Sequence, residues 1–216
     1  AERLLRHLKL HCFQAPIVLE GGAIHVDGEG TLLTTEECLL NKNRNPHLSR
    51  AEIEKVLQQY LGIKKIIWLK RGLDNDHTDG HVDNVACFAR PGLVLVQACH
   101  DRADPNYAIT QENIAILEGA SDAGGRKLEV VKLQQPPPVY LNGIRLPLSY
   151  VNFYFVNGGI ILPTFGGICR TTDELAVALL KDIFPERKLV TVDGMPIVKG
   201  GGSVHCITQQ MPAAML

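Results

Sequence analysis

Four side chains in the sequence could together carry out covalent chemistry at an electrophilic carbon. Glu20 precedes two glycines, His81 and Asp83 lie in the stretch GHVDN, and Cys206 follows three glycines in KGGGSVHCIT. A thiolate attacks such a carbon, a histidine relays the proton, and a carboxylate orients that histidine. A carboxylate that is free of the thiol can grip a planar guanidinium through bidentate hydrogen bonds. The set therefore suggests covalent catalysis by a cysteine on a cationic ligand.

Each of these residues also has a purely structural interpretation. Taken alone, Cys206 is more typical of a buried hydrophobic residue, Glu20 of a turn carboxylate, and His81 of a satisfied polar residue at a strand edge. The case for catalysis depends on their recurrence at equivalent places in a repeat.

A metal site is the second chemical interpretation, based on the stretch HTDGHVD (77–83). Two histidines and two aspartates lie close together there, as metal ligands often do. His77, however, precedes Gly80 and is expected in a loop, off the face of the strand that follows. We therefore do not expect a metal at this stretch.

The elements that must position these residues recur in the order strand, strand, helix, strand. Hairpins are predicted at 17–35, 81–98 and 150–164, with turns at 27–28, 91–92 and 157–158. A helix follows each hairpin. The first has a capping box at Ser49 and Glu52 and ends at Gly62, the second lies near 111–119, and the third has a capping box at Thr171 and Glu174. Strands at 64–70, 127–133 and 188–194 close the three ββαβ units.

The repeat predicts where the four side chains meet. If rotation relates the units, their first strands line a common axis, and Glu20, His81, Asp83 and Cys206 converge on it. His81 and Asp83 are two apart on a predicted strand, so both can face one ligand.

The two ends of the chain do not complete the repeat. A predicted helix at 2–10 and strand at 15–19 lack a preceding hairpin, and a predicted strand at 203–209 lacks its partner. We expect units N-terminal to residue 1 to be missing from this single catalytic domain (1–216). The alternative is an ordinary α/β domain with a frayed edge.

The composition is that of an ordinary globular domain. The 216 residues are 45% hydrophobic and 21% charged, and the net charge of −1 argues against nucleic acid or an acidic membrane as partner. No apolar run reaches the roughly 18 residues of a membrane span, and no signal peptide opens the sequence. The six cysteines form no CxxC motif, so we expect reduced thiols and a cytoplasmic location.

Four long stretches resemble one known family. EGGAIHVDGEGTLLTTEECLLNKNRNPHLS, GHVDN, SYVNFYFVNGGII and GGGSVHCITQQ are similar to the bacterial-type peptidylarginine deiminase family of the guanidino-group-modifying superfamily, and within it to the agmatine deiminases. The resemblance extends from about residue 14 to 212. It implies a pseudo-fivefold α/β propeller of ββαβ units, incomplete in this chain, with the active site on the axis.

The resemblance also implies an activity without metal or cofactor. Agmatine and water would give N-carbamoylputrescine and ammonia, in putrescine biosynthesis. Cys206 would attack the guanidinium carbon and form an amidino-cysteine, His81 would act as acid and then base, and Glu20 would orient His81. Asp83 would bind the guanidinium, and the backbone at Gly201 and Gly202 would pass close to this flat substrate.

The chain departs from the family at three places, one of which is the segment 134–149, shorter than in many relatives. No Arg-Asp motif lies upstream of EGG, although the family uses an aspartate there to grip the guanidinium. Cys99 and His100 stand where relatives often have Thr-Asp. Deimination of free or peptidyl arginine and a truncated, non-catalytic remnant therefore stay open, and the family makes a homo-oligomer an expectation.

Overall fold

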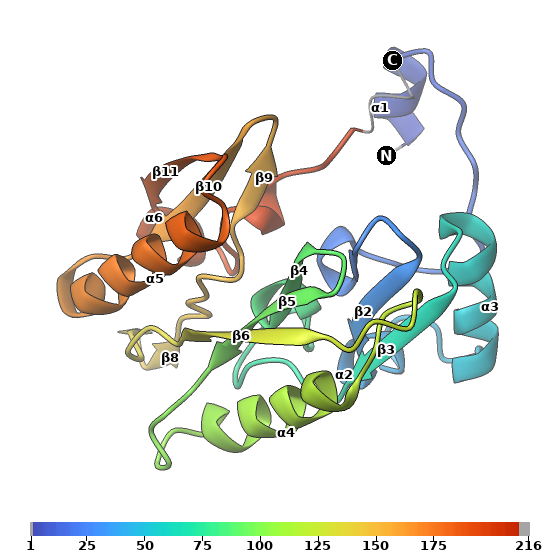
Figure 1. The fold of residues 1–216 in the computed structure, drawn as a ribbon. Helices are drawn as coiled ribbons and strands as arrows, with labels where there is room; N and C mark the ends of the chain where they lie inside the picture. Colours follow the sequence, from blue (N-terminus) through green and yellow to red (C-terminus); the bar gives the residue numbers. More distant parts are fainter. Residues whose placement is uncertain (1, 212–216) are drawn as a thin grey trace.

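Three ββαβ units follow one another in the computed structural model, which describes residues 2–211 (Figure 1). The first unit consists of β1 (His25–Val26), β2 (Thr31–Thr35), α3 (Arg50–Leu61) and β3 (Lys65–Leu69), with the short α2 (Glu36–Leu39) after β2. The second consists of β4 (Ala86–Arg90), β5 (Leu93–Ala98), α4 (Asn106–Gly119) and β6 (Glu129–Gln134). The third consists of β9 (Tyr154–Val156), β10 (Gly159–Thr164), α5 (Arg170–Ile183) and β11 (Lys188–Asp193).

Each unit forms its own three-stranded sheet with the same topology. The first two strands pair antiparallel, and the third strand pairs parallel to the second, as β2 with β3, β5 with β6 and β10 with β11. A parallel neighbour requires a long crossover, and in each unit a helix supplies it. The predicted triple repeat is confirmed.

Local sequence explains α3 but not α5. Ser49 and Glu52 form the predicted capping box, and Gly62 ends α3 with a φ of 66°. The capping box predicted at Thr171 and Glu174 is wrong. A 3-10 helix, η3 (Gly167–Cys169), leads directly into α5, so that Thr171 already lies inside the helix.

The predicted strands at 15–19 and 203–209 are also wrong, and residues 82–84 are not in a strand. Residues 15–19 form no helix or strand, and η1 (Gly21–Ala23) follows them. Two further short 3-10 helices, η2 (Val82–Asn84) and η4 (His205–Ile207), stand at the other two places. Their backbone amides are satisfied locally, for example Val85 N to Val82 O at 2.8 Å and Thr208 N to His205 O at 3.0 Å. A strand would need a partner strand instead. The N-terminal helix α1 (Glu2–His7) is shorter than predicted.

The second unit lies between the other two (Figure 1). All six residues of β5 are buried. One core cluster joins it to the first unit and includes Leu33, Leu69 and Val94, whereas another joins it to the third unit and includes Leu95 and Leu162. Apolar burial on both sides fixes how the units sit against one another.

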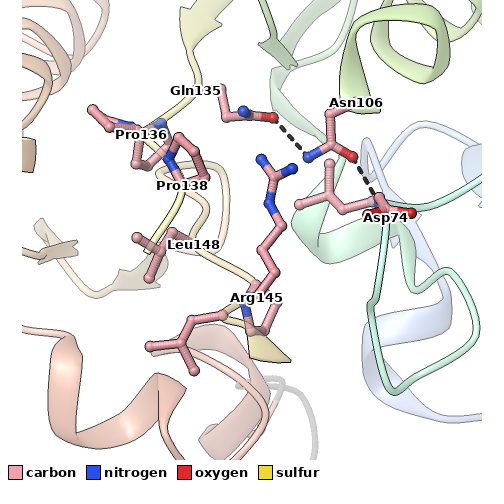
Figure 2. Close-up of a pocket in the computed structure, with 11 residues that line it drawn as sticks. Asp74, Asn106, Gln135, Pro136, Pro138, Arg145 and Leu148 are labelled. Carbon is pink, nitrogen blue, oxygen red and sulfur yellow. Dashed lines mark hydrogen bonds between the residues drawn. The ribbon is translucent and has the colours of Figure 1, made fainter. Parts of the chain in front are cut away.

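A buried polar network anchors the segment between the second and third units. Figure 2 shows Asn106, which accepts a hydrogen bond from Asp74 N at 2.7 Å and donates one to Gln135 Oε1 at 2.8 Å. Arg145, in β8 (Ile144–Arg145), pairs with Asp104 through bonds of 2.7 and 2.8 Å. The cavity that remains there is about 10 Å³, which is room for about one water. The network is therefore structural.

Two further short elements complete the described part of the chain: β7 (Tyr140–Leu141), which pairs with β8, and α6 (Met195–Val198), which precedes the glycine run. Among residues 2–211, no helix has the length and apolar character that crossing a membrane would require.

Candidate active site

The three short helices η1, η2 and η4 meet at one cavity of about 460 Å³. It is called the site cavity below. Its walls are made by the following residues: Glu20, Gly21, Gly22, Thr78, His81, Asp83, Ile197, Gly200, Gly201, Gly202, and His205 to Gln210. The structure thus brings together all six residues that the sequence singled out as catalytic or substrate-binding.

Glu20 and His81 form one half of the site cavity. Glu20 directly precedes η1, and its Oε1 lies 3.5 Å from His81 Nε2. Nε2 is buried and makes no hydrogen bond to any protein atom in the described part of the chain. Glu20 therefore faces one ring nitrogen, and the other nitrogen, Nδ1, lies on the side of Gly22.

Arg44 holds this half in place, and the sequence analysis did not identify it. Its Nε donates to both oxygens of Glu20, at 3.0 and 3.3 Å, and Nη1 lies 3.1 Å from Asp79 Oδ2. Nη2 donates to the carbonyl of Thr78 at 2.5 Å. Only 8% of the Arg44 side chain is exposed, so the guanidinium is a buried junction between the chain before η1 and the loop before His81.

The environment keeps Glu20 ionised. Partial burial opposes the charged form, but the hydrogen bonds and positive charge of Arg44 outweigh it, so that the pKa of Glu20 is below its usual value. The carboxylate can therefore stabilise a positive charge on His81.

Cys206 and Asp83 form the other half. Cys206 lies in η4, and its Sγ is 3.4 Å from Asp83 Oδ2. The amide of Asn152 donates to the same Sγ at 3.3 Å, and Asn152 Oδ1 accepts from His205 N at 2.9 Å. Asn152 therefore fixes the backbone and the thiol of η4 together, a role that the sequence did not predict.

The thiol of Cys206 is protonated in this environment. The residue is exposed at the cavity wall, yet the protein packed around its sulfur and the nearby charge of Asp83 raise the pKa of Cys206 to about 12. A cation bound beside the sulfur would offset both effects.

The two carboxylate oxygens of Asp83 differ, because one lies at hydrogen-bond distance from a side chain and the other does not. Its Oδ2 is 2.9 Å from His205 Nδ1, whereas Oδ1 is buried and has no hydrogen-bond partner among the described residues. A buried carboxylate oxygen without a donor is costly. The geometry is therefore suited to an N–H donor that arrives with a ligand.

Two glycines are required by the site itself. A Cβ on Gly22 would lie 2.5 Å from His81 Nδ1 and 2.7 Å from Asp83 Oδ2, and one on Gly202 would lie 2.8 Å from Cys206 Cβ. Their small size makes room for the site's own side chains, whereas the sequence analysis predicted room for the substrate. Gly201 has a φ of 98°, a conformation that favours glycine.

The structure changes the reasons behind two predictions. His81 and Asp83 share the site cavity although residues 82–84 form a 3-10 helix, so strand alternation does not explain their placement. The HTDGHVD stretch does not gather its four side chains, because Asp79 binds Arg44 and Asp83 faces His205. His77 lines a different cavity.

Comparison with known proteins identifies the family. The model of the Porphyromonas-type peptidyl-arginine deiminases matches residues 1–212. The chain belongs to this family.

Individual relatives of the chain are named for one activity. The agmatine deiminase of Pseudomonas aeruginosa is 53% identical over 91% of the chain, and that of Medicago truncatula is 49% identical over 93%. The chain spans less than two thirds of their lengths, 57% of the first and 59% of the second.

Solved structures in this deiminase family share the fold. The agmatine deiminase of Enterococcus faecalis, described as catalysing its reaction, superposes with a TM-score of 0.91 at 39% identity and covers 98% of the chain, which spans 62% of it. A Cys-to-Ser variant of the C. jejuni agmatine deiminase with substrate bound superposes with a TM-score of 0.87 at 32% identity, covering 95% of the chain and 60% of its own. The predicted propeller fold is confirmed, and the described residues contain three of its units.

Proposed function

We propose that this chain carries the catalytic residues of an agmatine deiminase, a hydrolase of carbon–nitrogen bonds in linear amidines. The observation that carries the proposal is the convergence of Cys206, His81, Asp83 and Glu20 on one cavity, in a family member whose named relatives are agmatine deiminases. Acid–base and nucleophilic groups within one cavity are what such a reaction needs.

Substrate binding begins at Asp83. The free Oδ1 accepts an N–H of the guanidinium, whose positive charge then lies beside the Cys206 thiol. That charge counters the repulsion between Asp83 and a thiolate, so the thiol releases its proton to solvent when substrate is present. The resting enzyme keeps Cys206 protonated, and substrate binding activates it.

The covalent steps then use Cys206 and His81. The Sγ attacks the guanidinium carbon and forms a C–S bond, and ammonia leaves with a proton donated by His81 as the C–N bond breaks. Water attacks the amidino-cysteine carbon and gives its proton to His81. The C–S bond breaks, which releases N-carbamoylputrescine and the free cysteine. Glu20, held by Arg44, stabilises the protonated His81 in this cycle.

The lining of the site cavity favours agmatine over arginine. Free arginine carries an α-carboxylate that needs a cationic partner, and no lysine or arginine occurs among the cavity-lining residues that the structure describes. Agmatine has an ammonium at that end of the molecule. Deimination of arginine is accordingly the second candidate function.

The location and assembly complete the proposal. All six cysteines are free, which is usual in a reducing compartment, and we place the protein in the cytoplasm. The family resemblance leads us to propose a homo-oligomer. Neither nucleic acid nor membrane enters the proposed function.

The proposal is tested by an assay for ureido product. The chain is incubated with agmatine, free arginine or a peptidyl-arginine mimic, beside its Cys206→Ser variant and the full-length gene product. Product from agmatine that is abolished in Cys206→Ser supports the proposal. Product from arginine alone would move the assignment to the second candidate, and no product from the full-length protein would refute deimination.

A further inference from the structure

A group of possible metal ligands lies beside His81, in the half of the site cavity that Glu20 and His81 form. One ligand atom from each of Glu20, Cys38 and His81 lies within 4.8 Å of the others. Glu20 borders the site cavity and is 38% exposed at its side chain, whereas Cys38 is fully buried in α2. The proposed reaction gives Cys38 no task.

The donor types select a class of metal. A thiolate, an imidazole and a carboxylate together suit Zn²⁺ and similar thiophilic ions, and not the hard cations Mg²⁺ and Ca²⁺. Bonds of about 2.0–2.3 Å place tetrahedral ligand atoms roughly 3.3–3.8 Å apart. Shifts of about 1 Å therefore bring the three atoms to binding distance, and a tetrahedral ion would keep a fourth position for water.

Charge and unmet hydrogen-bonding capacity favour the same occupant. Beside this group, the carboxylates of Glu20 and Asp79 both pair with the single guanidinium of Arg44. The local charge is thus negative before any metal enters. His81 Nε2 is buried, without a hydrogen-bond partner in residues 2–211, and lies 3.5 Å from Glu20 Oε1.

We propose that Glu20, Cys38 and His81 form an inhibitory site for a thiophilic divalent cation of the Zn²⁺ class. The cation enters from the site cavity, the Cys38 thiol releases its proton to solvent, and the three side chains bind the ion. With a metal on one nitrogen, the ring of His81 can no longer alternate between imidazole and imidazolium. Binding is independent of the proposed deiminase function, whereas inhibition depends on it.

Zinc binding is measured in a variant that lacks the two solvent-accessible thiols, those of Cys12 and Cys206. Cys12 and Cys206 are the cysteines that are not buried, so the chain carries Cys12→Ser and Cys206→Ser. Zn²⁺ is titrated against a chromophoric chelator. Adding Cys38→Ser is expected to weaken binding at least tenfold, because even outer-shell partners of a metal contribute about 10–100-fold. Adding Cys87→Ser, at another buried cysteine, should leave the affinity unchanged.

X-ray absorption at the zinc edge identifies the ligands without relying on a folded Cys38 variant. In the Cys12→Ser, Cys206→Ser background, the first shell should contain one sulfur and at least two lighter atoms. A shell without sulfur, or an affinity that Cys38→Ser does not change, overturns the site.

Inhibition is measured separately on chain that retains Cys206. Zn²⁺ should abolish ureido production, a chelator should restore it, and Cys38→Ser should raise the inhibitory concentration by the same factor as the affinity loss. Sulfur ligation without turnover in any sample would leave the metal site standing and count against the deiminase. Turnover that is insensitive to Zn²⁺ at saturation would refute the inhibitory role.

Discussion

The two halves of the site cavity are built in different ways. Around Glu20 and His81, a buried arginine ties together two stretches of chain by five hydrogen bonds, to Glu20, Asn43, Thr78 and Asp79. Around Cys206, the backbone comes from three consecutive glycines, and the thiol is held chiefly by Asn152 and Asp83. Several hydrogen bonds therefore connect the acid–base half to the rest of the chain, whereas the nucleophile half follows a glycine segment, whose backbone has more conformational freedom.

The contrast follows from what each half must do in the proposed reaction. His81 has to keep one position through two proton transfers, so rigidity is useful there. Cys206 has to approach a carbon, carry it as a covalent adduct and release it, so its sulfur must move. Each prediction below changes one half and measures whether the other responds.

The largest effect is expected from Gly22→Ala, which strikes the point where the two halves touch. A Cβ 2.5 Å from His81 Nδ1 and 2.7 Å from Asp83 Oδ2 displaces these groups by about 1 Å. A misplacement of that size costs about a hundredfold in rate. We expect kcat/KM with agmatine to fall by about that factor. Gly119→Ala, where nothing lies within 4 Å, is the matched control and should be neutral.

Alkylation of Cys206 by iodoacetamide tests the resting state of the nucleophile half. Because the pKa of Cys206 is raised to about 12, the thiolate fraction rises about tenfold per pH unit below that value. The alkylation rate, followed by mass spectrometry of the Cys206 peptide, should therefore keep increasing from pH 7 to pH 10. A plateau reached by pH 8 would show a thiolate at rest, and Arg44→Ala should leave the profile unchanged.

Arg44→Ala removes the junction of the acid–base half. Breaking a buried ion pair costs about 3–5 kcal/mol, but Glu20 and Asp79 are 38% and 44% exposed and can recover hydration. We therefore expect the free energy of unfolding in urea to fall by about 1–3 kcal/mol, and kcat to fall more than the alkylation rate of Cys206. Equal losses in both would mean that the halves are not separate. Arg50→Ala, at an exposed ion pair, is the control.

The smallest effect on activity is expected at His25, which lies behind the nucleophile half with its ring 6.4 Å from that of His205. Burial and the charge of His205 lower the pKa of His25 to about 4, from an ordinary 6.5. The unfolded chain binds the proton first, so this stability is complete above pH 6.5 and is lost as pH falls toward 4. This difference in pKa corresponds to about 3 kcal/mol of stability. His25→Gln, which can still accept from Phe88 N, should flatten this part of the stability curve.

The sequence predicted the repeat and that six named residues lie together, but not the way in which they meet. The α3 capping box, Gly62 and the Asn157-Gly158 turn are local signals. They were sufficient to predict the ends of α3 and the hairpin of β9 and β10. The 3-10 helices at 82–84 and 205–207 have no such local signal. These segments do not form strands because the fold places no partner strand beside them, and the sequence does not show that. Arg44 could not be ranked above the other arginines, since its partners are 24 and 35 residues away.

The topology that the three sheets share determines which contacts can form early in folding. Within a unit, every strand pairing joins residues less than about 40 positions apart, whereas the contacts of Cys206 span 54 and 123 positions. Contacts of low sequence separation form sooner, because closing a short loop costs less entropy. We expect amide protection to appear first in the individual sheets and last in η4, so that the protein becomes chemically competent only in its final folding step.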